Sequence, residues 1–215
     1  MSFLDQLKIQ ASAVKSRQNQ QQIEHDTTTL ATEQTCCTIF FYLEQMVQSL
    51  NLIEPDGPRL SVDGKTPWPP MKLTAFQLDS RKKKLRDREV FDYIGVAWQI
   101  VPRAGRPQSG SVSANFMPDL QRLEARLATG WVQHERHEIR HPEKNTVQAV
   151  RLDYTTLSRG NIRVTPDHET ANLAFRLANL TGFGLAHTIW PSAQVNTQVL
   201  DELAKMVCGQ PSRFA

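Results

Sequence analysis

The chain has 215 residues, of which 40% are hydrophobic and 22% charged, and its formal net charge is +3. These values are typical of a globular protein, and they exclude a fibrous or generally disordered chain. The charge is too small and too dispersed to indicate nucleic-acid binding by itself, since proteins that bind polyanions usually concentrate basic residues on one surface.

The cysteines and the first residues bear on where the protein resides. An odd number of cysteines, Cys36, Cys37 and Cys208, with two of them adjacent, favours a reducing compartment over a disulfide framework. Asp5 and Lys8 interrupt the apolar core that a signal peptide would need. The longest apolar run, CCTIFFYL, is far shorter than the ~20 residues of a membrane-spanning helix. We therefore expect a cytoplasmic protein with no membrane contact.

Residues 1–54 are predicted to form an N-terminal helical arm. Apolar side chains recur at helical spacing near its start, at Leu4, Leu7, Ala11 and Val14. The next run, KSRQNQQQ, loses this stripe and is either a solvated helix or a polar hinge. Asp26 then suits the N-cap of a second helix that ends near Ile53.

The second helix is apolar around an unusually wide arc. Its main face consists of Ile39, Leu43, Met46, Leu50 and Ile53. Phe40, Phe41 and Val47 widen that face, so the helix is either buried between layers of its own domain or shared with another chain. In the first case Cys36 and Cys37 are small buried hydrophobes. In the second case the predicted partner-binding residues are Leu4, Leu7, Val14, Phe40, Phe41 and Val47.

Residues 55–70 are predicted to connect the arm to the rest of the chain. Five of the 12 prolines fall in this segment, and proline resists both helix and interior strand. A proline-rich stretch around Trp68 could also dock into an aromatic groove, but a clean PxxP repeat is missing. A connection is the simpler interpretation.

Residues 71–215 are predicted to form one α+β domain that begins with an antiparallel pair of strands, 72–78 and 90–101. Alternation places Leu73 on one face of the first strand and Phe76 on the other. The basic residues between the strands are Arg81, Lys82, Lys83, Lys84, Arg86 and Arg88. Four acids accompany them, and pairing across the hairpin is worth ~0.2–1 kcal/mol per pair, which leaves little uncompensated positive charge. We interpret the segment as a solvated hairpin and keep the six bases as an alternative polyanion-binding site.

The segment WVQHERHEIRHP contains three histidines, His134, His137 and His141. On a helix they would share a face and could chelate a metal, whereas on a strand His134 and His137 point to opposite sides. The flanking Gly130 and Pro142 favour a hairpin. We therefore assign no metal ligand and no cofactor.

The remaining elements follow from caps and periodicity. A leucine stripe predicts a helix over 118–129, and alternating Ile and Val predict a strand near 159–164. Residues 171–180 fit a helix or a strand, and the turn after them favours a strand. Asn196 suits the N-cap of a final amphipathic helix, 197–208.

The predicted architecture is α+β: a mainly antiparallel β-sheet covered by amphipathic helices, with an N-terminal helical arm. The common motifs for phosphate binding, nucleophilic catalysis and zinc are absent from the sequence. Catalytic residues that assemble from distant positions leave no such motif, so an enzyme stays open without a named residue. The leading hypothesis is a non-catalytic binding or scaffold protein whose N-terminal helices bind another protein or a second copy of the chain. The alternatives are a polyanion-binding or nucleic-acid-binding module and a small metal-dependent hydrolase.

Overall fold

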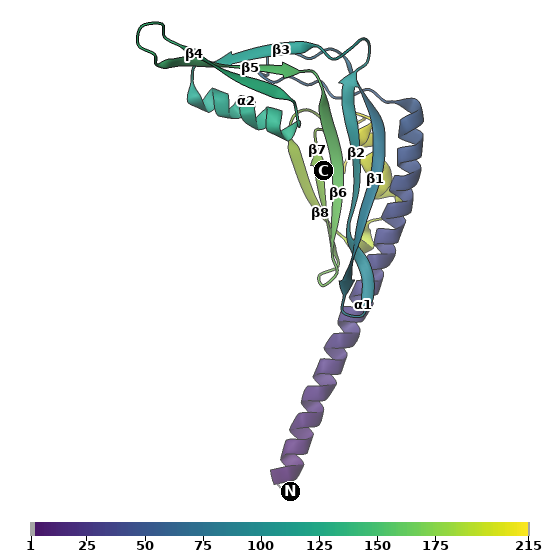
Figure 1. The fold of residues 1–215 in the computed structure, drawn as a ribbon. Coiled ribbons are helices and arrows are strands. Elements are labelled where there is room, and N and C mark those ends of the chain that lie inside the picture. The colour runs from purple at the N-terminus through teal and green to yellow at the C-terminus, as the bar shows by residue number, and fades with distance from the viewer. Residues whose placement is uncertain (1–2, 215) are drawn as a thin grey trace.

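The computed structural model describes residues 3–214 and begins with one uninterrupted helix, α1 (Phe3–Ile53), shown in Figure 1. Its 51 residues contain neither glycine nor proline, and the polar run after Val14 is rich in Gln, Lys and Arg, which favour helix. Of the two alternatives for that run, the solvated helix is confirmed. The N-cap assignment of Asp26 is wrong, because Asp26 lies within the helix and accepts a hydrogen bond from Gln22 at 3.1 Å.

Two antiparallel sheets follow the helix, and they confirm the predicted fold class. The larger sheet has the order β1 (Met71–Leu85), β2 (Arg88–Pro102), β6 (Ser158–Asp167), β7 (Asn172–Ala178), β8 (Leu185–Pro191). The smaller sheet has the order β3 (Ser109–Ala114), β5 (Val147–Thr155), β4 (His134–Arg140). The sequence predicted the strands other than β3, including β7 in the ambiguous segment, but it predicted neither β3 nor the division of the strands between two sheets.

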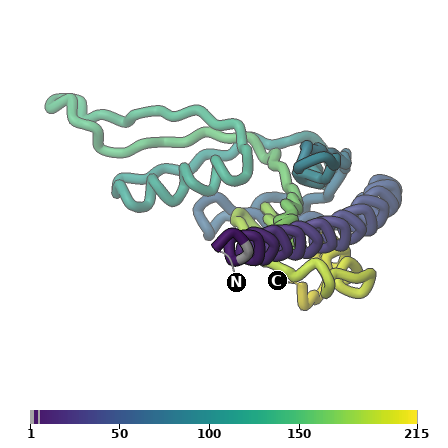
Figure 2. Tube along the Cα trace, turned by 90° about the horizontal axis from the view of Figure 1, so that it is seen from below, coloured from purple at the N-terminus to yellow at the C-terminus, as the bar shows by residue number. Residues whose placement is uncertain are grey.

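Three shorter helices complete the fold: α2 (Met117–Thr129), η1 (Ser192–Gln194) and α3 (Thr197–Val207). The side chain of Asn196 caps α3 as predicted, accepting a hydrogen bond from the Val199 N–H at 3.1 Å. The two helices α1 and α3 lie on one side of the larger sheet, and the Tyr42 hydroxyl of α1 donates to Asp201 of α3 at 2.7 Å. Helix α2 and the smaller sheet project on the other side (Figure 2). The sheet is therefore covered by helices on one face.

The core lies between the larger sheet and the helices α1 and α3, and it continues between α2 and the smaller sheet. Its residues from the larger sheet include Ile94, Val96, Trp98, Ile100, Ile162, Val164, Leu173, Phe175 and Leu177. The proline-rich connection also contributes to the core, since Leu60, Val62 and Trp68 are buried. The indole of Trp68 stacks on the ring of Tyr154, with 5.8 Å between their centroids.

One predicted alternation is wrong, and a β-bulge is the reason. The pairing of β1 with β2 shifts between Thr74 and Gln77, where Ala75 has φ +54°, so Leu73 and Phe76 are both buried on the same side. Asn51 at the end of α1 holds this bulge. Its amide donates to the Phe76 carbonyl at 3.0 Å and accepts from the Phe76 N–H at 2.8 Å.

Candidate functional site

The C-terminal half of α1 is attached to the larger sheet by one narrow stripe. The buried residues of this stripe are Thr29, Thr32, Cys36, Ile39, Leu43, Met46 and Leu50. Their spacing alternates between three and four residues, as expected for one helix face. Burial, reinforced by the neighbouring Glu33, raises the pKa of the Cys36 thiol to about 12, which keeps it protonated at neutral pH. Cys36 is thus a buried hydrophobe as predicted, but Cys37 is exposed, because it lies outside the stripe.

The stripe stops at Thr29, and the helix leaves the domain there. Continued at the same spacing, the stripe would meet His25, Gln22 and Gln18, whose polar side chains gain nothing from burial against the sheet. The last contact is an ion pair between Asp26 and Arg86, with the nitrogen and oxygen 3.4 Å apart. Residues 3–25, hereafter the projecting segment, extend away from the domain as exposed helix (Figure 1).

The projecting segment has its own apolar stripe. Leu7 and Val14 are 45% and 53% exposed, and Leu4 is 58% exposed. With about 100° of rotation per residue, the stripe formed by Leu4, Leu7, Ala11 and Val14 lies on the same side of α1 as the buried stripe, since Leu7 and Leu43 are about ten full turns apart. A molecule that contacts these residues would therefore approach from the side of α1 that the sheet covers farther along the helix.

The other predicted partner-binding residues lie in the attached half of α1. Phe40 and Val47 are half-buried against the core, and the Phe40 ring stacks on Phe91 at 5.8 Å between centroids. Phe41 is 60% exposed, but about 40 Å of helix separates it from Val14. The structure thus places Leu4, Leu7 and Val14 together on the projecting segment, and Phe40 and Val47 in the packing of the domain.

The six basic residues of the hairpin lie around the tip of β1 and β2, and several have partners within the chain. Lys83 pairs with Asp92 at 3.2 Å, and the Lys82 ammonium lies 5.1 Å from the centroid of the Phe91 ring. Arg86, as noted, pairs with Asp26, and Lys84 lies opposite Glu89 in the strand register. The Arg81 guanidinium lies farther from its acidic neighbour, at 3.9 Å from an oxygen of Asp92. Arg88 begins β2 opposite Leu85. The hairpin therefore presents less uncompensated charge than its sequence suggests.

The histidines of the smaller sheet do not gather at one point. His134 and His137 belong to β4 and point to opposite faces, and His137 lies 3.4 Å from an oxygen of Asp153. His141 follows the strand, where its ring accepts the Glu143 N–H at 3.2 Å. Within residues 3–214, no group of three or more His, Cys, Asp or Glu side chains could hold a metal ion.

One set of candidate residues escaped the sequence analysis. Arg159, Arg163 and Arg176 point outward from β6 and β7, on the face of the larger sheet that α1 and α3 leave uncovered. Alternation within the predicted strands could have assigned them to the outward side. Their proximity depends on how β6 pairs with β7, and no local pattern encodes that pairing.

Comparison with known proteins identifies no relative: no protein-family model, curated protein or solved structure matches the chain. Among the residues that the structure describes, no helix is both long and apolar enough to cross a membrane. The candidate sites consequently rest on geometry and chemistry alone.

Proposed function

We propose that this is a non-catalytic binding or scaffold protein that self-associates through its projecting segment. Two copies pair in parallel along the stripe that contains Leu7 and Val14. The observation that carries the proposal is the exposed apolar stripe of residues 4–14, which lies beyond the end of the domain. Because this stripe faces the same side of α1 as the buried stripe, the two paired helices have to diverge before the domains begin near Asp26.

The spacing of the stripe supports a second copy as the occupant. Intervals of three, four and three residues are those of the narrow seam of a two-stranded coiled coil. Continued at that spacing, the seam contains Gln18 and Gln21. A glutamine amide both donates and accepts hydrogen bonds, so each can pair with the same residue of a parallel copy. Polar seam residues of this kind fix register and orientation.

The charges beside the seam are compatible with parallel pairing. Lys8 and Lys15 flank one side of the seam, and Arg17 flanks the other. In a parallel coiled coil a residue on the Arg17 side of the seam faces the residue five positions later on the other side of the partner's seam. Gln10 of one copy then faces Lys15 of the other, and Arg17 faces Gln22. These pairs bring no like charges together.

Sedimentation velocity over a concentration series tests this proposal. The wild-type chain should shift from monomer to dimer as its concentration rises. The double substitution Leu7→Glu with Val14→Glu places carboxylates in the seam and should abolish the shift. The matched control is Gln6→Glu with Ser16→Glu, which adds the same charge to the same helix outside the seam and should leave dimerisation intact. A wild-type chain that stays monomeric up to its solubility limit would refute the proposal.

We also propose a cytoplasmic location. The observation that supports it is the state of the cysteines, since Cys36, Cys37 and Cys208 are all free thiols in the structure. Unpaired thiols, one of them exposed, suit a reducing compartment. Recovery of the native protein from the cytosolic fraction of its own cells would test this placement.

A further inference from the structure

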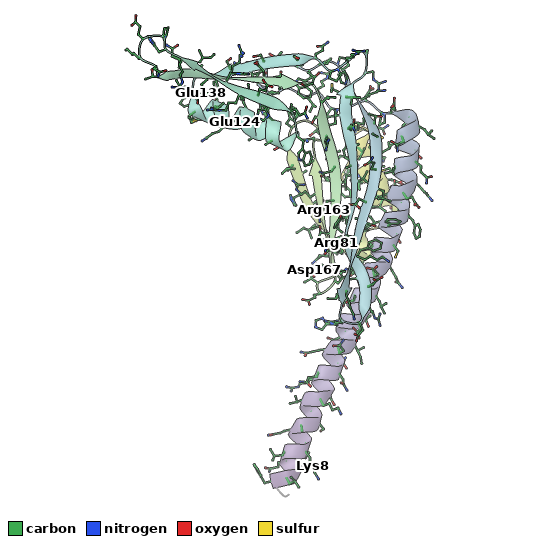
Figure 3. All side chains as sticks on the ribbon, viewed as in Figure 1. Lys8, Arg81, Glu124, Glu138, Arg163 and Asp167 are labelled. Atoms are coloured by element: carbon green, nitrogen blue, oxygen red, sulfur yellow. The ribbon has the colours of Figure 1, made fainter. Side chains whose placement is uncertain are left out.

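The uncovered face of the larger sheet, hereafter the open face, carries a row of basic side chains. Arg163 of β6 lies opposite Arg176 of β7, and Arg176 lies opposite His187 of β8. Arg159 lies four residues before Arg163, so it shares this face at about 13 Å. On the other side of Arg163, Arg81 of β1 lies opposite Tyr93 of β2, and Figure 3 shows Arg81 and Arg163 close together on the sheet.

The arginines of β6 and β7 on the open face have no direct ion pair with another described residue, although Asp79 and Asp167 lie on the same face. In the described part of the structure, no carboxylate oxygen lies within 4 Å of a side-chain nitrogen of Arg159, Arg163 or Arg176. This distinguishes the open face from the tip of the hairpin, where Lys83 and Arg86 have acidic partners. Arginine keeps its charge at any physiological pH, so these groups attract anions under all such conditions.

An aromatic ring and two small residues of β2 lie among the arginines of the open face. The Arg163 guanidinium stacks over the Tyr93 ring, with its central carbon 4.0 Å from the ring centroid. The Tyr93 hydroxyl donates to Asp79 at 2.6 Å, which fixes the ring. The neighbouring outward residues of β2 are Gly95 and Ala97, so little side-chain volume obstructs a ligand that lies across the strands.

An exposed tryptophan borders the same face beside Arg159. A hollow of about 240 Å³ is lined by Gln99, Trp131, Gln133, Leu157, Ser158 and Arg159. Trp131 is 49% exposed, and its φ of +48° is a conformation that a bulky side chain rarely adopts. The preceding carbonyl, that of Gly130, accepts hydrogen bonds from the Ser158 hydroxyl at 2.9 Å and the Arg159 N–H at 3.2 Å. These bonds to β6 hold the strained turn and keep the indole at the rim of the open face.

We infer that the open face binds single-stranded nucleic acid. The arginines are positioned to neutralise phosphates, and the half-exposed Trp131 ring offers a stacking platform for a base. The amides of Gln99 and Gln133 in the same hollow can both donate to and accept from base edges. An acidic peptide would use the arginines but not the aromatic ring or the amides. A duplex hides the faces of its bases, so a single strand is the form that fits.

Fluorescence anisotropy with labelled oligo(U) and oligo(dT) of about 12 nucleotides, a length within known single-strand site sizes, tests the inference. The wild-type chain should bind, and Arg163→Glu with Arg176→Glu should weaken binding at least about tenfold. The slope of log affinity against log salt should fall by about 1.4, since each single-strand phosphate contact contributes about 0.7. Arg106→Glu with Lys144→Glu makes the same charge change in loops outside the open face and should bind as the wild type does.

The aromatic contact has its own variants. Trp131→Ala should weaken binding about fivefold or more, while Trp131→Phe should retain most of it, because base stacking needs an aromatic face. Melting curves of each variant confirm that the fold persists, and sedimentation of the Arg163→Glu, Arg176→Glu variant should match the wild type. Failure of this inference is therefore separate from failure of self-association.

Three results would overturn the inference. The first is absence of salt-dependent binding by the wild-type chain. The second is a pair of outcomes: the variant with Lys82, Lys83 and Lys84 changed to Glu loses binding, while the variant with Arg163 and Arg176 changed to Glu retains it. That pair would place the site on the hairpin. The third is equal competition by a poly-glutamate peptide and an oligonucleotide of the same charge, combined with unchanged binding by the Trp131→Ala variant. This result would show recognition of negative charge alone.

Discussion

The two halves of α1 belong to one continuous helix, yet they meet their surroundings in opposite ways. Residues 29–50 bury a stripe against the larger sheet, whereas the apolar stripe of the projecting segment stays exposed although it faces the same side of the helix. Local propensity explains why both halves are helical, because nothing in the sequence breaks the helix. The polar residues His25, Gln22 and Gln18, which interrupt the apolar stripe, explain why only one half is attached. Continuity of secondary structure and membership of a domain are thus set by different features of the sequence.

The largest expected difference between the halves concerns the hydrophobic stripe itself. Leu43 is fully buried in the attached half, so Leu43→Ala should reduce the free energy of unfolding by about 2–5 kcal/mol. Leu7→Ala, the same substitution in the projecting segment, should change it by less than about 0.5 kcal/mol. Urea denaturation at concentrations where the chain is monomeric measures both values. Equal losses for the two variants would mean that the projecting segment packs on the domain.

A smaller difference concerns polar contacts. Asn51→Ala removes both hydrogen bonds that α1 makes to the backbone of Phe76, and it should destabilise the domain by about 1–3 kcal/mol. The matched change in the projecting segment is Gln20→Ala, which removes an exposed hydrogen bond to Glu24 and should have an effect within about 0.5 kcal/mol. Thermal denaturation of the two variants compares them. An Asn51→Ala variant as stable as the wild type would show that the bulge does not depend on α1.

The end of the attached half should also respond to pH. Hydrogen bonds from Lys72 and Thr74 hold the pKa of Glu54 below its ordinary value of 4.5. The contribution of this carboxylate to stability is therefore present above pH 4.5 and is lost as the pH falls through its lower folded pKa. Glu54→Gln should be slightly less stable than the wild type at pH 7, and this difference in the free energy of unfolding should disappear at acidic pH. A difference that is constant or that grows towards low pH would contradict this assignment.

The smallest expected effect is that of removing most of the projecting segment. Deletion of residues 1–22 leaves every residue of the buried stripe in place, so the melting temperature should stay within the error of measurement. The far-ultraviolet circular dichroism signal for helix should fall in proportion to the residues removed. A clear drop in melting temperature would show that the segment supports the domain.

Much of the fold could be predicted from local patterns. Asn196 and the leucines of α2 define their helices through caps and periodicity, and strict alternation defines β2. Features that depend on distant contacts could not be predicted in this way. The bulge at Ala75 is held by Asn51 from another element, and the open face requires the pairing of β6 with β7. The apolar stripe of residues 4–14 was visible in the sequence, but its separation from the domain became clear only when the buried stripe was known.

Cysteine cross-linking tests the parallel pairing of the projecting segments most directly. The exposed Cys37 is first replaced by serine, and Val14→Cys or Ser16→Cys is then introduced into that background. Position 14 lies in the proposed seam, where two parallel copies bring the same residue together, and position 16 lies on the far side of the helix. Mild oxidation should convert the Val14→Cys chain, and not the Ser16→Cys chain, into a covalent dimer. Failure of Val14→Cys to cross-link, or equal cross-linking by both, would contradict the proposed self-association.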